Sequence, residues 1–142
     1  MFSESLIDPA IIKAYRETDY HVHGDVPFTL TIGAVSPALL TLQAATKTAS
    51  SAFITACNPF SEATVDTTNA DRQRALSSDL HQRGLKFING IGMHPSNQWA
   101  GEPSLLVPGV SLDTAKTLGV YYEQNAIVWS GPDGIPRLIL LR

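Results

Sequence analysis

Apolar positions recur with two different periods along the chain, and each period predicts one type of element. Alternation at every second residue, or a short uncharged apolar run, is typical of strands, whereas spacings of three or four residues are typical of helices. We expect strands over residues 20–23, 28–32, 52–57, 85–89, 104–107, 126–129 and 137–141. We expect helices from 9 to about 16, from 38 to about 47, from a cap at 68 to a cap at 84, and from 112 to about 122.

Capping residues give each predicted helix a local start signal. Asp8 and Ser36 each stand directly before a proline, which is a favoured residue at the first helical position. Ser111 and Thr68 are also suitable N-caps, because a short side-chain oxygen accepts a hydrogen bond from the first turn. Gly84 is suited to the left-handed conformation that ends many helices.

The segment 52–57 is the most informative of the predicted strands. It contains no charge and includes β-branched and aromatic residues, so we expect a strand that is covered on both faces. Pro59 lacks an amide hydrogen and should end the ladder, and the residue before a proline favours an extended backbone, so Asn58 is expected to be extended.

The inward stripe of the helix that follows becomes polar toward its start. Leu76 and Leu80 define this stripe, and its projection back along the helix passes through Arg72 and Asn69. One interpretation is that these two side chains extend past the edge of the core. The other is that they face a cleft beside the turn at 58–59, since strand ends beside helix starts are common ligand positions.

The order of elements predicts an α+β fold in one domain over residues 1–142. Residues 52–129 read as strand, helix, strand, strand, helix, strand, which is the ferredoxin-like β-α-β-β-α-β order. We expect a mixed, mostly antiparallel sheet that the C-terminal hairpin strand widens and that the N-terminal α-β-β-α segment extends or covers. Residues 90–103 show no periodicity, so this loop is either a lid or a mobile connection.

Composition and charge narrow the possible functions. The chain has 142 residues, of which 44% are hydrophobic and 16% are charged, as expected for a folded domain. Its net charge is −3 and it has no basic cluster, so binding to a nucleic-acid backbone is not expected. No apolar run has membrane-spanning length, the first residues do not resemble a signal peptide, and Cys57 is the single cysteine. These features predict a cytoplasmic protein.

Seven short motifs together resemble a known family. They are AYRETDY at 14–20, SPAL at 36–39, AFITACNP at 52–59, NADR at 69–72, GEPSLLVPG at 101–109, LG at 118–119 and QNAIVW at 124–129. This pattern is similar to the uncharacterised bacterial family named domain of unknown function 3293, over nearly the whole chain. The resemblance implies no activity. It does imply a set of polar positions that belong to the family pattern: Asn58, Asn69, Arg72, Glu102, Ser104, Gln124 and Asn125.

This set is rich in amides, which carry a donor and an acceptor and are suited to recognising polar ligands or main chain. Amides do not exchange protons near neutral pH, so Glu102 is the one candidate general base, and it has no histidine or second acid at a telling spacing. We expect Glu102 and Arg72 to meet as an ion pair, because an inward arginine needs a partner. Gln124 and Asn125 also suit the satisfaction of main-chain groups at a helix end.

No cofactor or metal site is predicted. His21 and His23 would lie on one face of a strand, but the spacing identifies no third ligand, and His94 or Asp19 would have to complete the set. Cys57 ends a buried strand, where cysteine usually acts as a small core residue. No phosphate-binding glycine loop, paired-cysteine motif or nucleophile elbow is present.

Three functions are compatible with these features. The first is a small cytoplasmic binding or regulatory module whose amide-rich site takes a small polar ligand or a protein partner. The alternative is a small enzyme in which Glu102 is a base or charge stabiliser and Arg72 holds an anionic group. A third is an interaction protein that adds a strand at 137–141.

Overall fold

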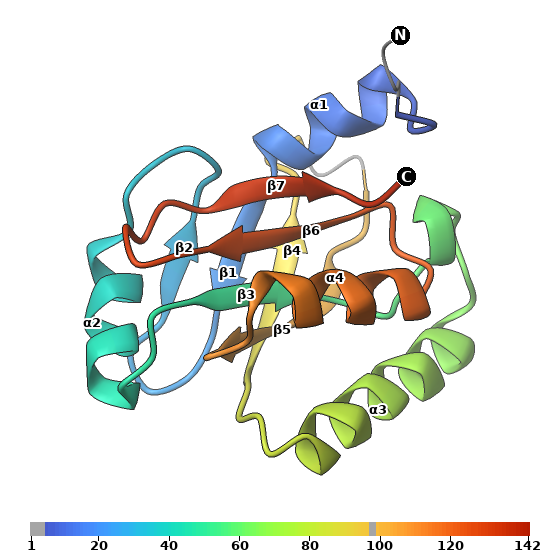
Figure 1. The fold of residues 1–142 in the computed structure, drawn as a ribbon. Helices are drawn as coiled ribbons and strands as arrows, with labels where there is room; N and C mark the ends of the chain where they lie inside the picture. The colour runs from blue at the N-terminus through green and yellow to red at the C-terminus, as the bar shows by residue number, and fades with distance from the viewer. Residues whose placement is uncertain (1–4, 97–98) are drawn as a thin grey trace, which may run out of the picture.

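The computed structural model describes residues 5–96 and 99–142, and it has four α-helices, one 3-10 helix and seven strands in that part of the chain (Figure 1). The helices are α1 (Pro9–Glu17), α2 (Pro37–Thr46), η1 (Pro59–Ser61), α3 (Asp66–Gln82) and α4 (Leu112–Tyr121). The strands are β1 (Asp19–Val22), β2 (Phe28–Leu30), β3 (Ser51–Ile54), β4 (Ile88–Met93), β5 (Glu102–Pro108), β6 (Ala126–Ser130) and β7 (Arg137–Leu140).

The strands form one sheet in the order β2-β1-β4-β5-β3-β6-β7, and every pairing among them is antiparallel. In this order β5 lies between the strands joined by α3, and β3 lies between the strands joined by α4. These are two interleaved split β-α-β units, which confirms the predicted ferredoxin-like order and the α+β class. The sheet is antiparallel throughout instead of mixed. The N-terminal strands extend one edge, and β7 extends the other.

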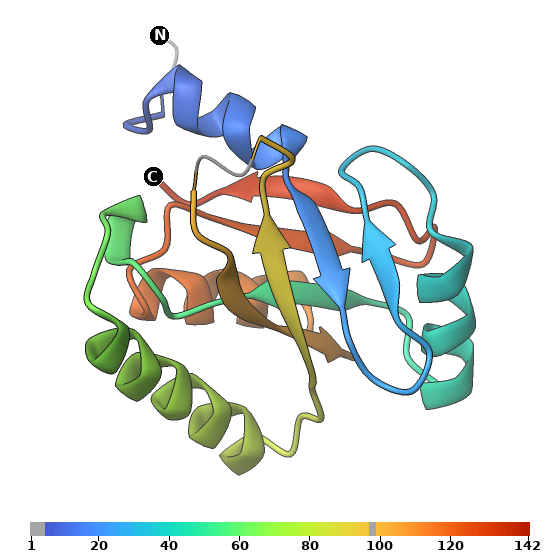
Figure 2. The same cartoon turned by 180° about the vertical axis from the view of Figure 1, so that it is seen from behind.

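The sheet curls strongly, so its two faces bury two separate apolar clusters. Helices α3 and α4 cover one face, where Leu76, Leu80 and Leu118 pack on the strands. The curl brings β1, β2 and β4 across the other face at a steep angle, as Figure 2 shows from behind. That inner face encloses a second cluster of buried residues, to which α2 contributes Leu39. Its members are Tyr20, Val22, Leu30, Leu39, Phe53, Leu106 and Val128.

The curl depends on a close approach at one glycine and on hydrogen bonds at the rim of the sheet. A Cβ at Gly90 would collide with the main-chain oxygen of His21 and with the ring of Phe53, so glycine permits the close crossing of β1 and β4 over β3. At the rim, the amide of Gly33 donates to the oxygen of Pro136 at 2.9 Å, and Ser36 donates to Gly134 at 2.9 Å. The segment after β2 is thereby joined to the segment before β7.

The predicted helix boundaries are confirmed where a cap is local. The side chains of Asp8, Ser36 and Ser111 each accept a hydrogen bond from the first turn of their helix. Gly84 has a φ of +74° at the end of α3, as expected. The predicted N-cap at Thr68 is wrong, because α3 begins at Asp66 after a residue without a side-chain cap, and the Asp66 carboxylate lies near the positive end of the helix dipole.

Two strands differ from the prediction by three residues or more at an end. The strand expected at 85–89 forms at Ile88–Met93, and it enters the segment 90–103 that shows no periodicity, because Gly90 and Gly92 interrupt the apolar pattern. The irregular part of that segment is therefore shorter than expected, and residues 97 and 98 within it lie outside the described residues. The strand expected at 52–57 ends at Ile54, so three buried or half-buried residues continue beyond the sheet.

We predict that Leu80→Ala lowers the free energy of unfolding by about 2–5 kcal/mol, because this side chain is fully buried between α3 and the sheet. Urea denaturation of the wild type and the variant measures the loss. Val120→Ala is the matched control on α4, where the side chain is 61% exposed, and it should change stability by less than about 0.5 kcal/mol. A loss of that small size at Leu80 would contradict the packing of α3.

Candidate functional site

The segment that follows β3 departs from ordinary backbone geometry. Asn58, Phe60 and Ser61 have φ values of 49°, 55° and 61°, in the left-handed region that non-glycine residues rarely adopt. The expectation of an extended Asn58 is therefore wrong. Asparagine tolerates this conformation better than most residues. The side-chain oxygen and the side-chain nitrogen of Asn58 both form hydrogen bonds here. Strained backbone persists only where its surroundings hold it, so the contacts of this segment are informative.

Asn58 and Asn69 form a reciprocal pair of amides. The side-chain oxygen of Asn69 accepts from the main-chain amide of Asn58 at 2.8 Å, and its Nδ2 donates to the side-chain oxygen of Asn58 at 2.8 Å. The same Asn58 oxygen accepts from the main-chain amide of Thr64 at 3.0 Å. The start of α3 is thus tied to both ends of the strained loop.

Arg72 binds main-chain oxygens instead of the predicted carboxylate. Its Nε donates to the oxygen of Ala56 at 2.6 Å, and its Nη2 donates to the oxygen of Tyr122 at 2.6 Å. Its ion pair is with Glu123, at 3.3 Å. The expected ion pair between Arg72 and Glu102 is wrong, because α3 turns the guanidinium toward the carbonyls that leave β3 and α4.

Gln124 and Ser104 also serve the main chain. The Nε2 of Gln124 donates to the oxygens of Cys57 and Tyr122, both at 3.1 Å. The hydroxyl of Ser104 donates to the main-chain oxygen of Glu102 at 2.9 Å. Both side chains are buried, and these hydrogen bonds give their polar atoms the partners that buried polar groups need.

Glu102 is a largely enclosed carboxylate at the start of β5. Its Oε2 accepts from the Nδ2 of Asn58 at 2.9 Å, and no ion pair to it forms among the residues that the structure describes. Burial raises the pKa of Glu102, and the hydrogen bond from Asn58 lowers this pKa by less. Strand register places Glu102 opposite Gly92, which is opposite Tyr20, so the carboxylate lies at the end of the inner cluster.

Asn125 is buried and turns away from these residues. Its Nδ2 donates to the hydroxyl of Tyr15 at 3.2 Å and to Ser61 Oγ at 3.1 Å. Its Oδ1 accepts from the guanidinium of Arg142 at 3.1 Å. The structure therefore brings Asn58, Asn69, Arg72, Glu102 and Gln124 together around residues 56–58, with Ser104 beside Glu102, and places Asn125 among different partners.

Several partners of the predicted residues were missed by the sequence analysis. Gln73 accepts from the amide of Ala56 at 2.9 Å and from the hydroxyl of Thr55 at 3.3 Å. Its Nε2 is buried without a hydrogen-bond partner in the part of the chain that the structure describes. Gln73 lies three residues before Leu76, so the helical stripe gave a signal for it. Ser61 and Arg142 carried no such signal, because only the fold brings them to Asn125.

Cys57 is not activated as a nucleophile. It is 2% exposed, and burial raises the pKa of its thiol, so the protonated form is favoured. Its sulfur lies 3.8 Å from the side-chain oxygen of Gln73 and 3.7 Å from the main-chain oxygen of Pro103. These neighbours are hydrogen-bond acceptors, so they too favour the protonated thiol.

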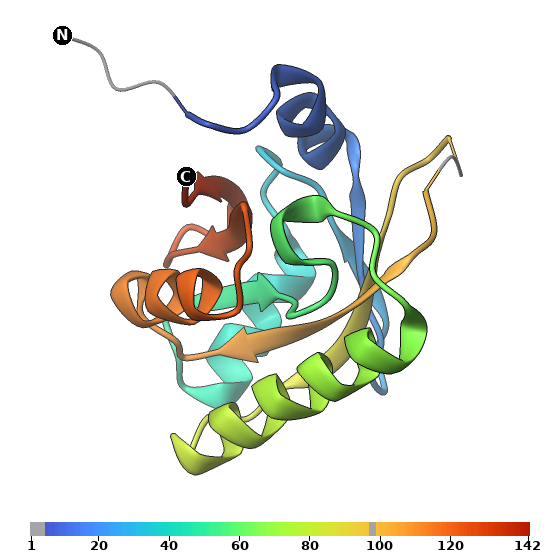
Figure 3. The same cartoon turned by 90° about the vertical axis from the view of Figure 1, so that its right-hand side faces the viewer.

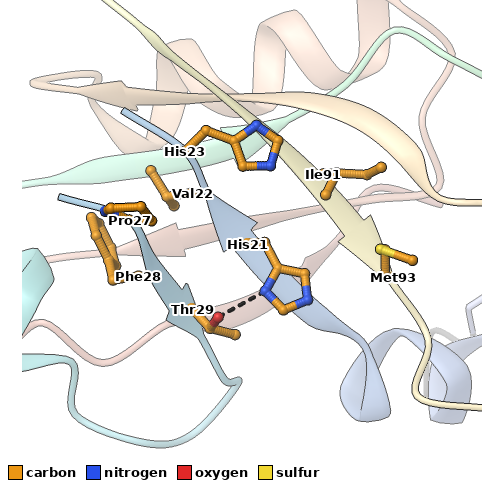
Figure 4. Close-up of a pocket in the computed structure, with 8 residues that line it drawn as sticks. All are labelled: His21, Val22, His23, Pro27, Phe28, Thr29, Ile91 and Met93. Carbon is orange, nitrogen blue, oxygen red and sulfur yellow. Dashed lines mark hydrogen bonds between the residues drawn. The ribbon is translucent and has the colours of Figure 1, made fainter. Parts of the chain in front are cut away.

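Two surface hollows lie on the sheet. One, of about 380 Å³, lies on the outer face of β1, β2 and β4, which no helix of the described residues covers (Figures 2 and 4). His21 and His23 line it together, as their spacing predicts, and the Nδ1 of His21 lies 2.7 Å from the hydroxyl of Thr29. A second, of about 280 Å³, lies between α3 and the strands and includes Gln73 and Ser104. The first hollow lies away from the polar cluster, and the second borders it at Gln73 and Ser104. The strained backbone and the enclosed carboxylate are at 58–61 and 102, so we place the candidate site there.

Metal binding stays untested at the histidine pair. Within residues 5–96 and 99–142, no group of three or more histidine, cysteine, aspartate or glutamate side chains is arranged to hold a metal ion. The absence of a metal site therefore remains a prediction.

The fold and the cluster define a small α+β protein in which amide and guanidinium side chains bind the main chain beyond a central strand. The chain belongs to the family described as protein of unknown function (DUF3293), whose model matches residues 54–127, more than half of the chain. This confirms the resemblance, and the family description assigns no activity. Comparisons with curated proteins and with solved structures found no match. No helix in the described residues is long and apolar enough to cross a membrane.

The raised pKa of Glu102 predicts a pH-dependent stability. The folded state holds this proton to a higher pH than the unfolded chain does. The stability that the bound proton contributes is therefore full below the unfolded pKa, and it is lost as pH rises through the folded pKa. Glu102→Gln keeps an oxygen for Asn58 and removes the titration. Urea denaturation should find the variant at least as stable as the wild type near pH 7, and the difference should vanish toward about pH 4.

Glu62→Gln is the control for this experiment, because Glu62 is exposed on the neighbouring turn. It should show no comparable pH-dependent difference. A Glu102→Gln variant that is clearly less stable than the wild type near pH 7 would mean that a positive group stabilises the carboxylate.

We predict that Arg72→Met lowers the free energy of unfolding by about 2–4 kcal/mol, because it leaves the oxygens of Ala56 and Tyr122 without this donor. Glu123→Gln removes only the partner that is 48% exposed and should cost less than about 1 kcal/mol. Chemical denaturation of both variants measures the two losses. Equal losses would show that the ion pair, and not the main-chain bonding, is the stabilising contact.

Proposed function

We propose that the protein is a small binding or regulatory module whose ligand contacts the surface formed by residues 58–61 and by Glu102. The observation that carries this proposal is a strained segment held by side chains from three other parts of the chain. Asn69 and Arg72 hold it from α3, Gln124 holds it from the turn after α4, and Glu102 holds it from β5. Positive φ values at non-glycine residues concentrate at ligand-contacting sites, where the strain fixes a recognition surface in advance.

The exposure of the segment supports the same proposal. The structure buries Ala56 and Cys57, but Phe60 is 37% exposed and Ser61 is exposed. A rigid exposed aromatic beside polar groups offers a ligand apolar area and hydrogen bonds at little cost in conformational entropy. The amides thus have an indirect part in the proposed binding: they position the segment, and the segment contacts the ligand.

The enzymatic alternative has less support. It requires Arg72 to hold an anionic group, but this guanidinium donates to two main-chain oxygens and pairs with Glu123. Glu102 alone keeps the property of a base or acid, because its pKa is raised by burial. A general base also needs a nucleophile or a substrate proton within hydrogen-bonding distance, and Asn58 is the partner that its carboxylate contacts.

We also propose a cytoplasmic location, for which the single cysteine and the absence of a long apolar run in the sequence are the support. Fractionation of the source cells with an antibody against the protein tests it. Recovery of the protein in the extracellular or envelope fraction would contradict the proposal.

A thermal-shift screen of small polar compounds, including neutral amides, amines and organic acids, tests the proposed function. A compound at roughly 100 times its dissociation constant should stabilise the wild type by about 2.7 kcal/mol. The proposal expects the effect of a true ligand to be lost in Glu102→Gln and kept in Glu62→Gln, with both variants folded by circular dichroism. Ligands that bind the Glu102 variant as well as the wild type would place the site elsewhere.

A further inference from the structure

A second polar cluster lies directly beside the strained segment. It joins Tyr15 on α1, Ser61 at the end of η1, Asn125 before β6 and Arg142 after β7. In Figure 3, α1 lies above η1, with the end of β7 next to both. Asn125 is only 4% exposed and contacts each of the other three residues, so it is the group that organises the cluster.

The hydrogen-bond donors of this cluster exceed its acceptors. The two hydrogens of the Asn125 amide go to the oxygens of Tyr15 and Ser61, and these two hydroxyls are also bonded to each other. One hydroxyl hydrogen is used in that mutual bond. The other has no acceptor among the contacts of the described residues, so it is available to an external group.

Arg142 adds a positive charge that has no acidic partner among the described residues. Its guanidinium lies 4.1 Å from the centroid of the Phe60 ring, and its Nη1 donates to the Oδ1 of Asn125. Among the described residues it forms no ion pair, whereas the nearby carboxylate of Glu123 pairs with Arg72. A guanidinium has five N–H groups in a planar fork, and within the described part of the chain one of them donates a hydrogen bond.

We propose that Arg142, Ser61 and Tyr15 bind an oxyanion, either the carboxylate or the phosphate of a small molecule. The guanidinium supplies charge and paired donors, the free hydroxyl hydrogen supplies a further donor, and Asn125 fixes the positions of all three. The ring of Phe60 holds the guanidinium in place by a cation–π contact. This inference rests on the proposed function, because it names the class of ligand for the same exposed segment.

The competing role for these residues is a purely structural link between α1, η1 and the end of β7. Both roles use the same internal hydrogen bonds. They differ in the external donors, since a structural link leaves the remaining N–H groups of Arg142 and the unpartnered hydroxyl hydrogen without a role. The test therefore removes the charge and measures anion binding directly.

Nitrogen-15 NMR titration of the full chain with sodium phosphate, and separately with sodium acetate, tests the proposal at constant ionic strength in sodium chloride. The amide signals of residues 58, 60–62 and 125 should shift together with a saturable curve. Arg142→Gln should weaken the binding at least about tenfold, as expected for the loss of a charge-assisted hydrogen bond. Arg142→Lys should retain part of the affinity, and the anion that binds more tightly identifies the ligand as a phosphate or a carboxylate.

Arg137→Gln is the matched control, because it removes the same charge from the other end of β7, where Arg137 pairs with Asp133. It should bind the anion like the wild type. Shifts that are scattered over the surface, or an equal weakening by both glutamine variants, would overturn the proposal in favour of general screening. If no oxyanion binds while the compound screen yields a neutral ligand that depends on Glu102, the binding module stands and the oxyanion assignment fails.

Discussion

The structure depends on the hydrogen bonds that replace the sheet where β3 ends. This strand is central and is paired on both sides, but it ends at Ile54 while the chain stays buried or half-buried through Cys57. Buried main-chain groups need partners, and side chains supply them here. Gln73 accepts from the main-chain amide of Ala56, and Arg72 donates to the main-chain oxygen of Ala56. Gln124 and Asn69 do the same for the next two residues: the oxygen of Cys57 and the amide of Asn58.

This requirement explains why the inner stripe of α3 changes from apolar to polar along its length. The C-terminal half packs Leu76 and Leu80 against strands whose main-chain groups pair with one another. The N-terminal half lies over the end of β3, where apolar side chains would leave the main chain unsatisfied. Most of the polar residues that the family resemblance implies thus bond main-chain groups. Their hydrogen bonds hold an exposed segment in the left-handed conformation, and this segment is the surface that we propose contacts the ligand.

The parts of the fold that follow from local rules were predictable. Alternation located the strands, capping residues located three helix starts, and the order of elements gave the interleaved split β-α-β units. The failures have non-local causes. Asn58 is left-handed because Asn69 and Glu102 bind it from distant segments, although the following proline favours an extended backbone. Arg72 was assigned to a carboxylate because pairing rules consider charges, whereas in the fold two main-chain oxygens lie closer to its guanidinium.

The pairing of β1 with β4 also has a consequence for the way the chain reaches this fold. His21 lies opposite Ile91, so the N-terminal hairpin finds its partner strand only after about seventy more residues are available. During synthesis from the N-terminus, β1 and β2 are exposed as an isolated hairpin, which has little stability in water. The split units from β3 to β6 should therefore assemble first and then recruit the hairpin. Hydrogen exchange would then find β1 and β2 opening more readily than β3 and β5.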